Sequence, residues 1–390
     1  MLKPFALGAS LLVLPVWAGD DLVPEKEEKT SNNGDWCESL EDFGKFYRDK
    51  KDPFVQRIEF YGRLNYQYGY SDINIQNLDF SGGGTDLRRL RFGANIEFLD
   101  DWKFSAGAKL SRGRKGASKM GYSEMDKLSL TYDFGKMWSF KDVSIGYGRM
   151  KYGVTGEWQE SAIEIKTVER SNLSNFFGRS RATGAKLKAN FWEIDWTLGV
   201  MAPEANDTWS QWEGGAVYYA SANIDLGKKK RLMLDFLHNG ADRSVTNQLY
   251  DYDWVASAAH FTRLGDWKLM ANGIYGESND EEVYGVVVMP SYEIINNKLE
   301  FVARYQWANA SSDVFTINRR NIRDTLNNRG VNLPGVQRRG DENHTIYVGL
   351  NYFLCDHYAK FMVGAEYETL TGPVADLEAT TLWAAFRMQF

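Results

Sequence analysis

The last eleven residues, TTLWAAFRMQF, alternate between apolar and mixed side chains up to the final position. One parity holds Leu382, Ala384, Phe386, Met388 and Phe390. A period of two is typical of a strand with one apolar face. A free strand end frays unless another strand holds it, and a closed barrel leaves no edge unpaired. The C-terminus therefore predicts the closing strand of a β-barrel, with Phe390 as the signal that directs its assembly.

The same alternation recurs along the chain from Arg57 to Phe390. Clear examples are RIEFYGRLNYQYGY, LRRLRFGANIEF, WKFSAGAKL, ATGAKLKANF, GAVYYASANID, RLMLDFLH, LEFVARYQW, TIYVGLNYFL and FMVGAEYE. We count about sixteen such runs, an even number as in single-chain outer-membrane barrels. Tight connections alternate with long loops at about 71–86, 203–213, 240–252 and 310–343. The pattern predicts an all-β, transmembrane antiparallel barrel over residues 57–390, with both termini on the periplasmic side.

A secreted β-sandwich is the alternative fold, because it also alternates, with its apolar face inward. So many strands would need two sandwich domains, and no linker divides the chain. Aromatic residues make up 14% of the sequence and gather near the strand ends, as in Tyr66, Tyr68, Tyr70 and Trp102. Such positions are typical of the aromatic girdles of membrane barrels. About sixteen strands enclose an aqueous channel, so the function expected is transport.

The N-terminus, MLKPFALGASLLVLPVWAGDD, has the features of a secretory signal peptide over residues 1–18. A lysine precedes a short apolar run, and Ala18 supplies a small residue at the cleavage point. The run is shorter than the roughly 20 residues of a membrane anchor. Residues 19–56 read as a periplasmic linker with a short helix, in which Leu40, Phe43 and Phe46 share one side. The expected location is the outer membrane of a Gram-negative cell.

Composition argues against other classes of function. The net charge of −6 disfavours nucleic-acid binding. Two cysteines make neither a disulfide scaffold nor a zinc site, and none of the four histidines has metal-ligand spacing. No cofactor is expected. The sequence also lacks the G-x-S-x-G motif of hydrolases, so an enzyme is not expected.

Three segments resemble the phosphate-selective porin O/P family. They are RRLRFG at 88–93 with the following DWKFSAGAKL, VSIGYGRMKYGV at 143–154, and NFFGRSRATGAKL at 175–187. With the terminal Phe390, the resemblance spans most of the chain after residue 57. It implies a homotrimeric, sixteen-stranded channel in the outer-membrane lipids that passes small anions such as phosphate or polyphosphate. A general non-selective or sugar-permeable porin is the alternative function.

The expected anion pathway consists of basic residues on the lumen face. Strand parity places there Arg63, Arg89, Arg91, Lys103, Lys109, Lys186, Lys188, Arg304, Lys360 and Arg387. Rings of such residues select anions. The family segments and the loop before residue 182 add Lys151, Arg179 and Arg181. Acidic residues share the same faces, however: Glu59, Glu97, Asp195, Asp225, Glu300 and Glu366.

One family position departs from the pattern and leaves an alternative open. The family has Gln-Phe-Lys-x-Pro-Phe where this chain has Arg149-Met150-Lys151-Tyr152-Gly153-Val154, so the lysine matches and the proline is missing. Parity places Arg149 and Lys151 outward, whereas a bulge at Gly146 or Gly148 would turn them inward.

Two loops also bear on transport. Residues 152–181 are long for a connection, and they either fold into the lumen or form a solvated external cover. Their charges are of both signs, which counts against a dedicated phosphate pore. The loop INRRNIRDTLNNRGVNLPGVQRRGD is the most basic, and it either steers anions to the mouth or contacts lipid phosphates. Lumen aromatics that invite a sugar-pathway interpretation are scattered over the strands: Tyr61, Trp192, Tyr219 and Trp383.

The two cysteines are expected to form a disulfide at the periplasmic rim. Cys355 lies in a short connection on the periplasmic side when strands are counted back from Phe390, and Cys37 precedes the first strand. Paired thiols in an oxidising compartment tend to bridge. Loop-closure entropy gives at most about 4–5 kcal/mol of stabilisation. The alternative is two separate thiols.

Overall fold

The computed structural model describes residues 35–75, 77–112, 120–178, 181–205, 210, 212, 214–242, 245, 248–317, 320–328, 339–373 and 376–390. The expected signal peptide and Arg179 lie outside the described residues. Among the described residues, none of the helices is long and apolar enough to cross a membrane.

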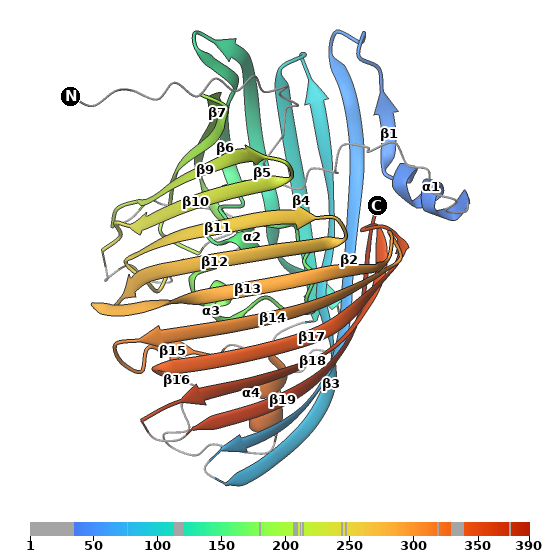
Figure 1. Cartoon of the computed structure of the whole chain (residues 1–390). Helices are drawn as coiled ribbons and strands as arrows, with labels where there is room; N and C mark the ends of the chain where they lie inside the picture. Colours follow the sequence, from blue (N-terminus) through green and yellow to red (C-terminus); the bar gives the residue numbers. More distant parts are fainter. Residues whose placement is uncertain are drawn as a thin grey trace, which may run out of the picture.

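Sixteen antiparallel strands form a closed ring (Figure 1). The ring is closed because its last strand pairs with its first, while every other pairing joins strands that follow one another in the ring. The strands are β2(Val55–Ile75), β3(Leu78–Phe98), β4(Trp102–Arg112), β5(Met120–Met137), β6(Phe140–Met150), β7(Ala182–Phe191), β8(Ile194–Met201), β9(Val217–Gly227), β10(Lys230–Asn239), β11(Trp254–Leu264), β12(Trp267–Ser278), β13(Glu281–Ile295), β14(Leu299–Ala310), β17(Glu342–Cys355), β18(Ala359–Thr371) and β19(Leu377–Gln389). The barrel expected from the alternation is confirmed.

The prediction of a long loop at residues 71–86 is wrong. Residues 71–86 do not form a long connection, because β2 continues to Ile75 and β3 starts at Leu78. Asn77 makes the tight turn with a φ of +65°. The glycine-rich run at 82–84 is paired strand, opposite residues 69–71 of β2. Polar side chains and glycines suggested a loop there, but both strands project beyond the apolar part of the wall, where polar side chains meet water on the outside.

The outward face of the wall is apolar along its middle. On β19, Leu382 is 56% exposed, whereas its inward neighbours Thr381 and Trp383 are 2% and 6% exposed. On β17 the outward Ile346 and Val348 alternate in the same way with buried residues. Because these apolar side chains point away from the interior, the wall suits a hydrocarbon environment.

The inner face differs from the polar lining that the alternation predicts. On β9 to β14 it is largely apolar and packs into one buried cluster, with Val217, Leu237, Val255, Met270, Ile274, Val283, Val287 and Val302 among its members. These strands carry apolar residues on both faces. That explains why the run VYGVVVMP in β13 and the segment of β11 alternate weakly in sequence.

The N-terminal segment lies beside β2 at the end of the seam between β2 and β19, near the C-terminus (Figure 1). The short helix α1(Asp35–Asp42) is followed by a short strand, β1(Lys45–Arg48), which pairs with residues 57–59 of β2. The expectation that Phe46 shares a helix face with Leu40 is therefore wrong. Backbone pairing with the free edge of β2 determines the conformation there, because β19 ends before it reaches those residues.

Phe390 sits where β19 ends and the N-terminal segment takes over. Its amide donates to the Gly62 carbonyl at 3.1 Å, and its carbonyl accepts from the Gly62 amide at 3.2 Å. Its ring lies over Gly62, where an added Cβ would come within 2.2 Å of a ring carbon. The Phe43 ring packs edge-on against it, with centroids 4.9 Å apart. The terminal residue thus joins three segments of the seam.

Deletion of Phe390 is therefore expected to lower the amount of folded barrel in the membrane several-fold. The deletion removes both hydrogen bonds to Gly62 and the ring that covers it. Phe390→Tyr keeps the ring and backbone and serves as the control. Heat-modifiable migration of membrane fractions measures the folded amount. Wild-type amounts of the deleted form would contradict the assembly role.

Cys37 and Cys355 are joined by a disulfide, with their Cα atoms 5.4 Å apart. The bond links α1 to the tight turn between β17 and β18. A small buried cluster surrounds it, formed by Tyr358 and Ala359 with partly buried Leu40, Leu354 and Met388. The helix is thereby fixed to the barrel rim at the end of the tight turns.

We expect non-reducing mass spectrometry of a tryptic digest to recover the two cysteine peptides as one linked species. Cys37→Ser/Cys355→Ser should detach the helix, so that proteases cleave the chain near residue 42 faster than in the wild type. The barrel itself should persist, because its strand pairs do not depend on this bond. Two unlinked peptides from the oxidised protein would refute the pairing.

Candidate functional site

The segment between β6 and β7 folds into the barrel. It carries the helices α2(Gly156–Gln159) and α3(Asn172–Phe177), both of which lie inside the ring in Figure 1. Most of its residues are buried, and Ile163 and Leu173 are 1% and 0% exposed. Of the two conformations left open by the sequence, the lumen-folded one is confirmed. We call residues 151–178 the inner loop.

Buried cations on the far wall hold the inner loop in place. Arg304 of β14 is 1% exposed and lies 3.0 Å from a Glu157 carboxylate oxygen and 3.1 Å from one of Glu366. Arg387 of β19 donates to the backbone carbonyls of Ala162, Ile165, Thr167 and Val168. Backbone carbonyls of the irregular loop have no neighbouring strand to pair with, and the two guanidinium groups supply hydrogen-bond donors for some of them.

Further contacts secure the loop to strands on the same side. The Lys360 amine donates to the Ile165 carbonyl at 3.0 Å, and the Lys166 amine pairs with Glu300. The Asn172 amide donates to Glu368 at 2.6 Å. Leu173 and Phe177 of the inner loop pack into the apolar inner face of the wall. These contacts fasten the loop to β14, β18 and β19.

Charges within the loop stay compensated. Burial would raise the pKa of Glu157, but the charge of Arg304 and hydrogen bonds from Ser171 and Ser174 bring the pKa below its ordinary value. Burial lowers the pKa of Arg170 to about 10, so it remains charged at neutral pH beside Glu157 and Glu160. Glu160 differs, because burial raises its pKa to about 7 and one carboxylate oxygen has no hydrogen-bond partner.

The opposite half of the barrel, β2 to β7, is basic where it faces the loop. The upper basic cluster gathers charges of β3, β5, the inner loop and the residue just before β7: Arg88, Arg89, Arg91, Arg170 and Arg181, with Glu169 and Asp126. Asp126 is shared by Arg91 at 3.1 Å and Arg181 at 3.3 Å. Apart from Arg170, which also lies beside Glu157 and Glu160, four cations face two carboxylates and leave this cluster positive.

A second group lies on the same wall nearer the tight turns. This lower basic cluster is formed by Arg57, Lys103, Lys127 and Lys188 around Glu97. The Lys103 and Arg57 side chains are 44% and 33% exposed although they face the interior. Water therefore reaches this wall, whereas the facing half is filled by the inner loop. The arrangement can conduct ions along the basic wall.

The remaining predicted residues serve the loop or pair with acids. Lys186 donates to the Lys151 carbonyl and lies 4.5 Å above the Tyr152 ring. Lys151 itself donates to carbonyls of the loop, at 3.2 Å for Glu160. Arg63 reaches Ser161 at 3.2 Å, and Lys109 pairs with Glu124 at 2.8 Å. Lys151, Lys186 and Arg304 thus position the inner loop.

The predicted alternative of a bulge at Gly146 or Gly148 is wrong, because the register of β6 with β5 and with β7 is continuous through both residues. Gly148 has a φ of +131°, and a Cβ there would lie 2.1 Å from the Leu128 carbonyl oxygen. The next residue, Arg149, is buried and donates to the Met125 carbonyl at 2.7 Å. Lys151 follows the end of β6, so strand parity does not apply to it.

Sequence reasoning missed four cations of the two clusters, which are Arg57, Arg88, Lys127 and Arg170. Arg88 has the outward parity, but a register shift pairs Asn65 with Arg89 and Tyr66 with Leu87, so Arg88 is the extra residue of a bulge. Its guanidinium reaches Glu169 at 2.9 Å. The dipeptide Arg88-Arg89 in a strand was the available signal, since one of two adjacent charges must face lipid unless the strand bulges.

The basic loop after β14 also enters the barrel mouth. Its helix α4(Arg320–Asn328) buries Ile322 and Leu326, and the Asn321 amide donates to Ser71 and Thr381 of the inner wall. Of the arginines expected to steer anions, the structure describes the side chains of Arg323, which is half-buried, and Arg339, which is exposed. Arg323 lies 3.3 Å from Asp324.

The aromatic residues considered for a sugar pathway do not line up. Tyr219 and Trp383 are buried in the apolar cluster, whereas Trp192 is 81% exposed at a tight turn. The Tyr61 ring covers Gly93 and Gly107. These positions give no continuous aromatic surface for sugars.

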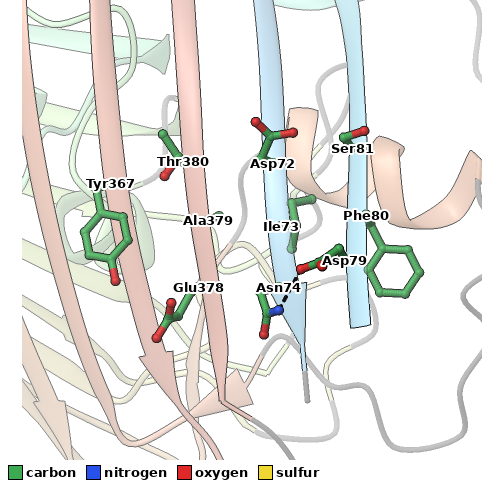
Figure 2. Close-up of a pocket in the computed structure, with 10 residues that line it drawn as sticks. All are labelled: Asp72, Ile73, Asn74, Asp79, Phe80, Ser81, Tyr367, Glu378, Ala379 and Thr380. Atoms are coloured by element: carbon green, nitrogen blue, oxygen red, sulfur yellow. Dashed lines mark hydrogen bonds between the residues drawn. The ribbon is translucent and has the colours of Figure 1, made fainter. Parts of the chain in front are cut away.

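A surface pocket of about 390 Å³ lies away from the basic wall. Figure 2 shows Asp72, Asn74, Thr380 and Glu378 on neighbouring strands around it. Asn74 donates to Asp79 at 2.7 Å. The exposed carboxylates are on the outward parity of β2 and β19, beyond the apolar band, so this pocket is not part of the interior passage.

Sequence comparison gives one match that extends over half of the chain. The family model described as phosphate-selective porin O and P matches residues 59–266. No curated protein sequence matches the chain significantly. The matched range contains the upper and lower basic clusters except Arg57, together with the whole inner loop.

Solved structures share the fold at low identity. The outer membrane channel DcaP of Acinetobacter baumannii has a TM-score of 0.55 and 11% identity, over 88% of this chain and 100% of that chain. An anion-selective porin from Comamonas acidovorans has a TM-score of 0.55 and 12% identity, over 85% and 99%. OmpF of Salmonella typhi, in complex with daunomycin, has a TM-score of 0.55 and 11% identity, over 89% and 100%. These likenesses support the closed barrel.

Proposed function

We propose that this chain, which belongs to the phosphate-selective porin O and P family, forms a passive, water-filled channel. In this proposal the channel prefers small anions such as phosphate. Family and fold make it an outer-membrane porin. The observation that carries the anion preference is the excess of cations on the wall from β2 to β7, where water reaches Lys103 and Arg57. In the upper basic cluster, apart from Arg170 beside Glu157 and Glu160, four cations face two carboxylates.

The inner loop narrows the passage in this proposal. It fills the half of the barrel lined by apolar side chains and brings Arg170 to the basic wall. An anion that passes the loop then meets the upper and lower basic clusters in turn. Loss of water around the ion is compensated by several guanidinium and ammonium donors, as in other anion pathways. The homotrimer implied by the family resemblance is part of the same proposal.

A general diffusion porin is the second candidate, and the pairing of charges favours it. Asp126 neutralises two arginines in part, and Glu124 pairs with Lys109. The reversal potential of channels in planar bilayers under a tenfold KCl gradient separates the two. A reversal potential shifted toward the equilibrium potential of chloride supports anion preference. A reversal potential near zero, or shifted toward the equilibrium potential of potassium, supports the general diffusion porin.

Anion preference is expected to fall as pH rises from 6 to 8. Glu160 has a pKa raised to about 7 by burial, so it is mostly neutral at pH 6 and carries a negative charge at pH 8. The added charge on the inner loop repels anions, and the ratio of anion to cation permeability should fall about two-fold, as one extra charge near 10 Å implies. Glu160→Gln should remove this change. An unaltered pH profile in that variant would contradict the assignment.

A further inference from the structure

Three phenylalanines of the N-terminal segment are unusually exposed. Phe43, Phe46 and Phe54 are 74%, 73% and 70% exposed, more than the apolar residues of the barrel wall such as Leu382 at 56%. They lie on residues 43–54, which we call the strap. The strap comprises the end of the helical turn, β1 and the turn that leads into β2. Its position is fixed by the disulfide on one side and the pairing with β2 on the other.

The strap continues the outward face of the wall. The Phe46 ring packs edge-on against Phe60, with centroids 5.8 Å apart, and Phe60 is an outward residue of β2 with 49% exposure. Phe43 packs against Phe390, which has the outward parity of β19. The exposed rings are therefore contiguous with the lipid-facing surface at the end of the tight turns. In outer-membrane barrels that end faces the periplasm.

Cations accompany these rings. Lys45, Arg48, Lys50 and Lys51 are all exposed on the strap. Its two carboxylates are engaged locally, since Asp49 accepts from the Lys51 amide at 2.9 Å and Asp52 accepts from the Phe54 amide at 2.8 Å and the Tyr47 hydroxyl at 2.7 Å. The preceding helix is acidic, and its Asp42 pairs with Lys45 at 2.6 Å. The strap thus carries four cations against two carboxylates beside the aromatic surface.

We propose that the strap is an interfacial anchor that binds the phospholipid headgroups of the periplasmic leaflet. Exposed aromatic rings beside lysine and arginine are the composition that settles at a membrane interface. The rings would insert at the headgroup level, and the cations would contact lipid phosphates. The lipid is the occupant because the patch extends a surface that already faces lipid. This role is separate from ion selectivity, since the strap lies outside the passage.

Photo-crosslinking in lipid bilayers tests the proposal directly. Benzoylphenylalanine at Phe46 keeps an aromatic ring, so the barrel should still fold, and heat-modifiable migration verifies this. The protein is reconstituted in vesicles of phosphatidylethanolamine and phosphatidylglycerol. Leu382, in the middle of the outward face, is the positive control position. Asn77, at the exposed tip between β2 and β3, is the negative control position.

The expected result is a lipid adduct at position 46 within about two-fold of that at position 382 and at least five-fold above that at position 77. A protein–protein adduct as the main product at position 46 would overturn the proposal in favour of a contact between copies of the chain. Adduct formation at the level of position 77 would overturn it in favour of a solvated strap. Channel conductance can be recorded from the same samples, so failure of the anchor is distinguished from failure of the channel.

Discussion

Arg304→Met is expected to release the inner loop and give channels with larger and noisier conductance. The variant leaves Glu157 and Glu366 buried without their cation, since both carboxylates lie within 3.1 Å of the guanidinium. Removal of one partner of a buried pair costs about 3–5 kcal/mol. The same guanidinium also donates to Thr167 and to the Glu169 carbonyl. Without it the loop loses contacts at three points along its length.

The matched control is Arg263→Met, because Arg263 also pairs with a carboxylate but is 34% exposed near a tight turn. Surface pairs contribute about 0–1 kcal/mol, so this control should conduct like the wild type. Single-channel recordings and limited proteolysis within residues 151–178 provide the readouts. A second variant, Arg304→Met/Glu157→Gln/Glu366→Gln, removes the stranded charges. It should recover folded protein but keep the altered conductance. Wild-type conductance in both Arg304 variants would show that other contacts hold the loop.

The barrel could be predicted from sequence because lipid imposes a strict rule on one face. Every second residue of a strand such as β17 must be apolar if it faces hydrocarbon, and the period of two then reveals the strand. The inward face follows no such rule. Where the inner loop packs on it, residues such as Val255 and Val287 are apolar, and where water reaches it, residues such as Lys103 are charged. Alternation therefore weakens in β11 to β13, where the apolar inner face packs against the inner loop.

The candidate site was predictable in part for the same reason. Parity placed Arg89, Arg91 and Lys103 on the inner face, and the register of β3 with β4 agrees with this. Parity could not say which inward cations hold the loop and which face water, because that depends on where residues 151–178 pack. Arg304 and Lys188 look alike in sequence, yet Arg304 is enclosed by carboxylates and Lys188 belongs to the lower basic cluster.

The choice of variants for ion selectivity follows from this division. Arg89→Gln/Lys103→Gln/Lys188→Gln removes three cations from the upper and lower basic clusters and spares those that bond to the inner loop. Each charge acts on a passing ion with about 0.4 kcal/mol at 10 Å in water, a factor of about two in local anion concentration. The ratio of chloride to potassium permeability should therefore fall about eight-fold. The reversal potential should move toward the cation side.

A matched control must remove as many charges from outside the passage. Lys228→Gln/Lys229→Gln/Lys230→Gln, at the exposed turn between β9 and β10, alters the net charge by three units far from the basic wall. If anion preference arises from local charge along the wall, this control keeps the wild-type reversal potential, because exposed charges beyond a Debye length of about 8 Å are screened. Equal shifts in both variants would assign the preference to net charge instead. No shift in the wall variant would remove the upper and lower basic clusters from the pathway, and would leave the barrel as a general diffusion channel.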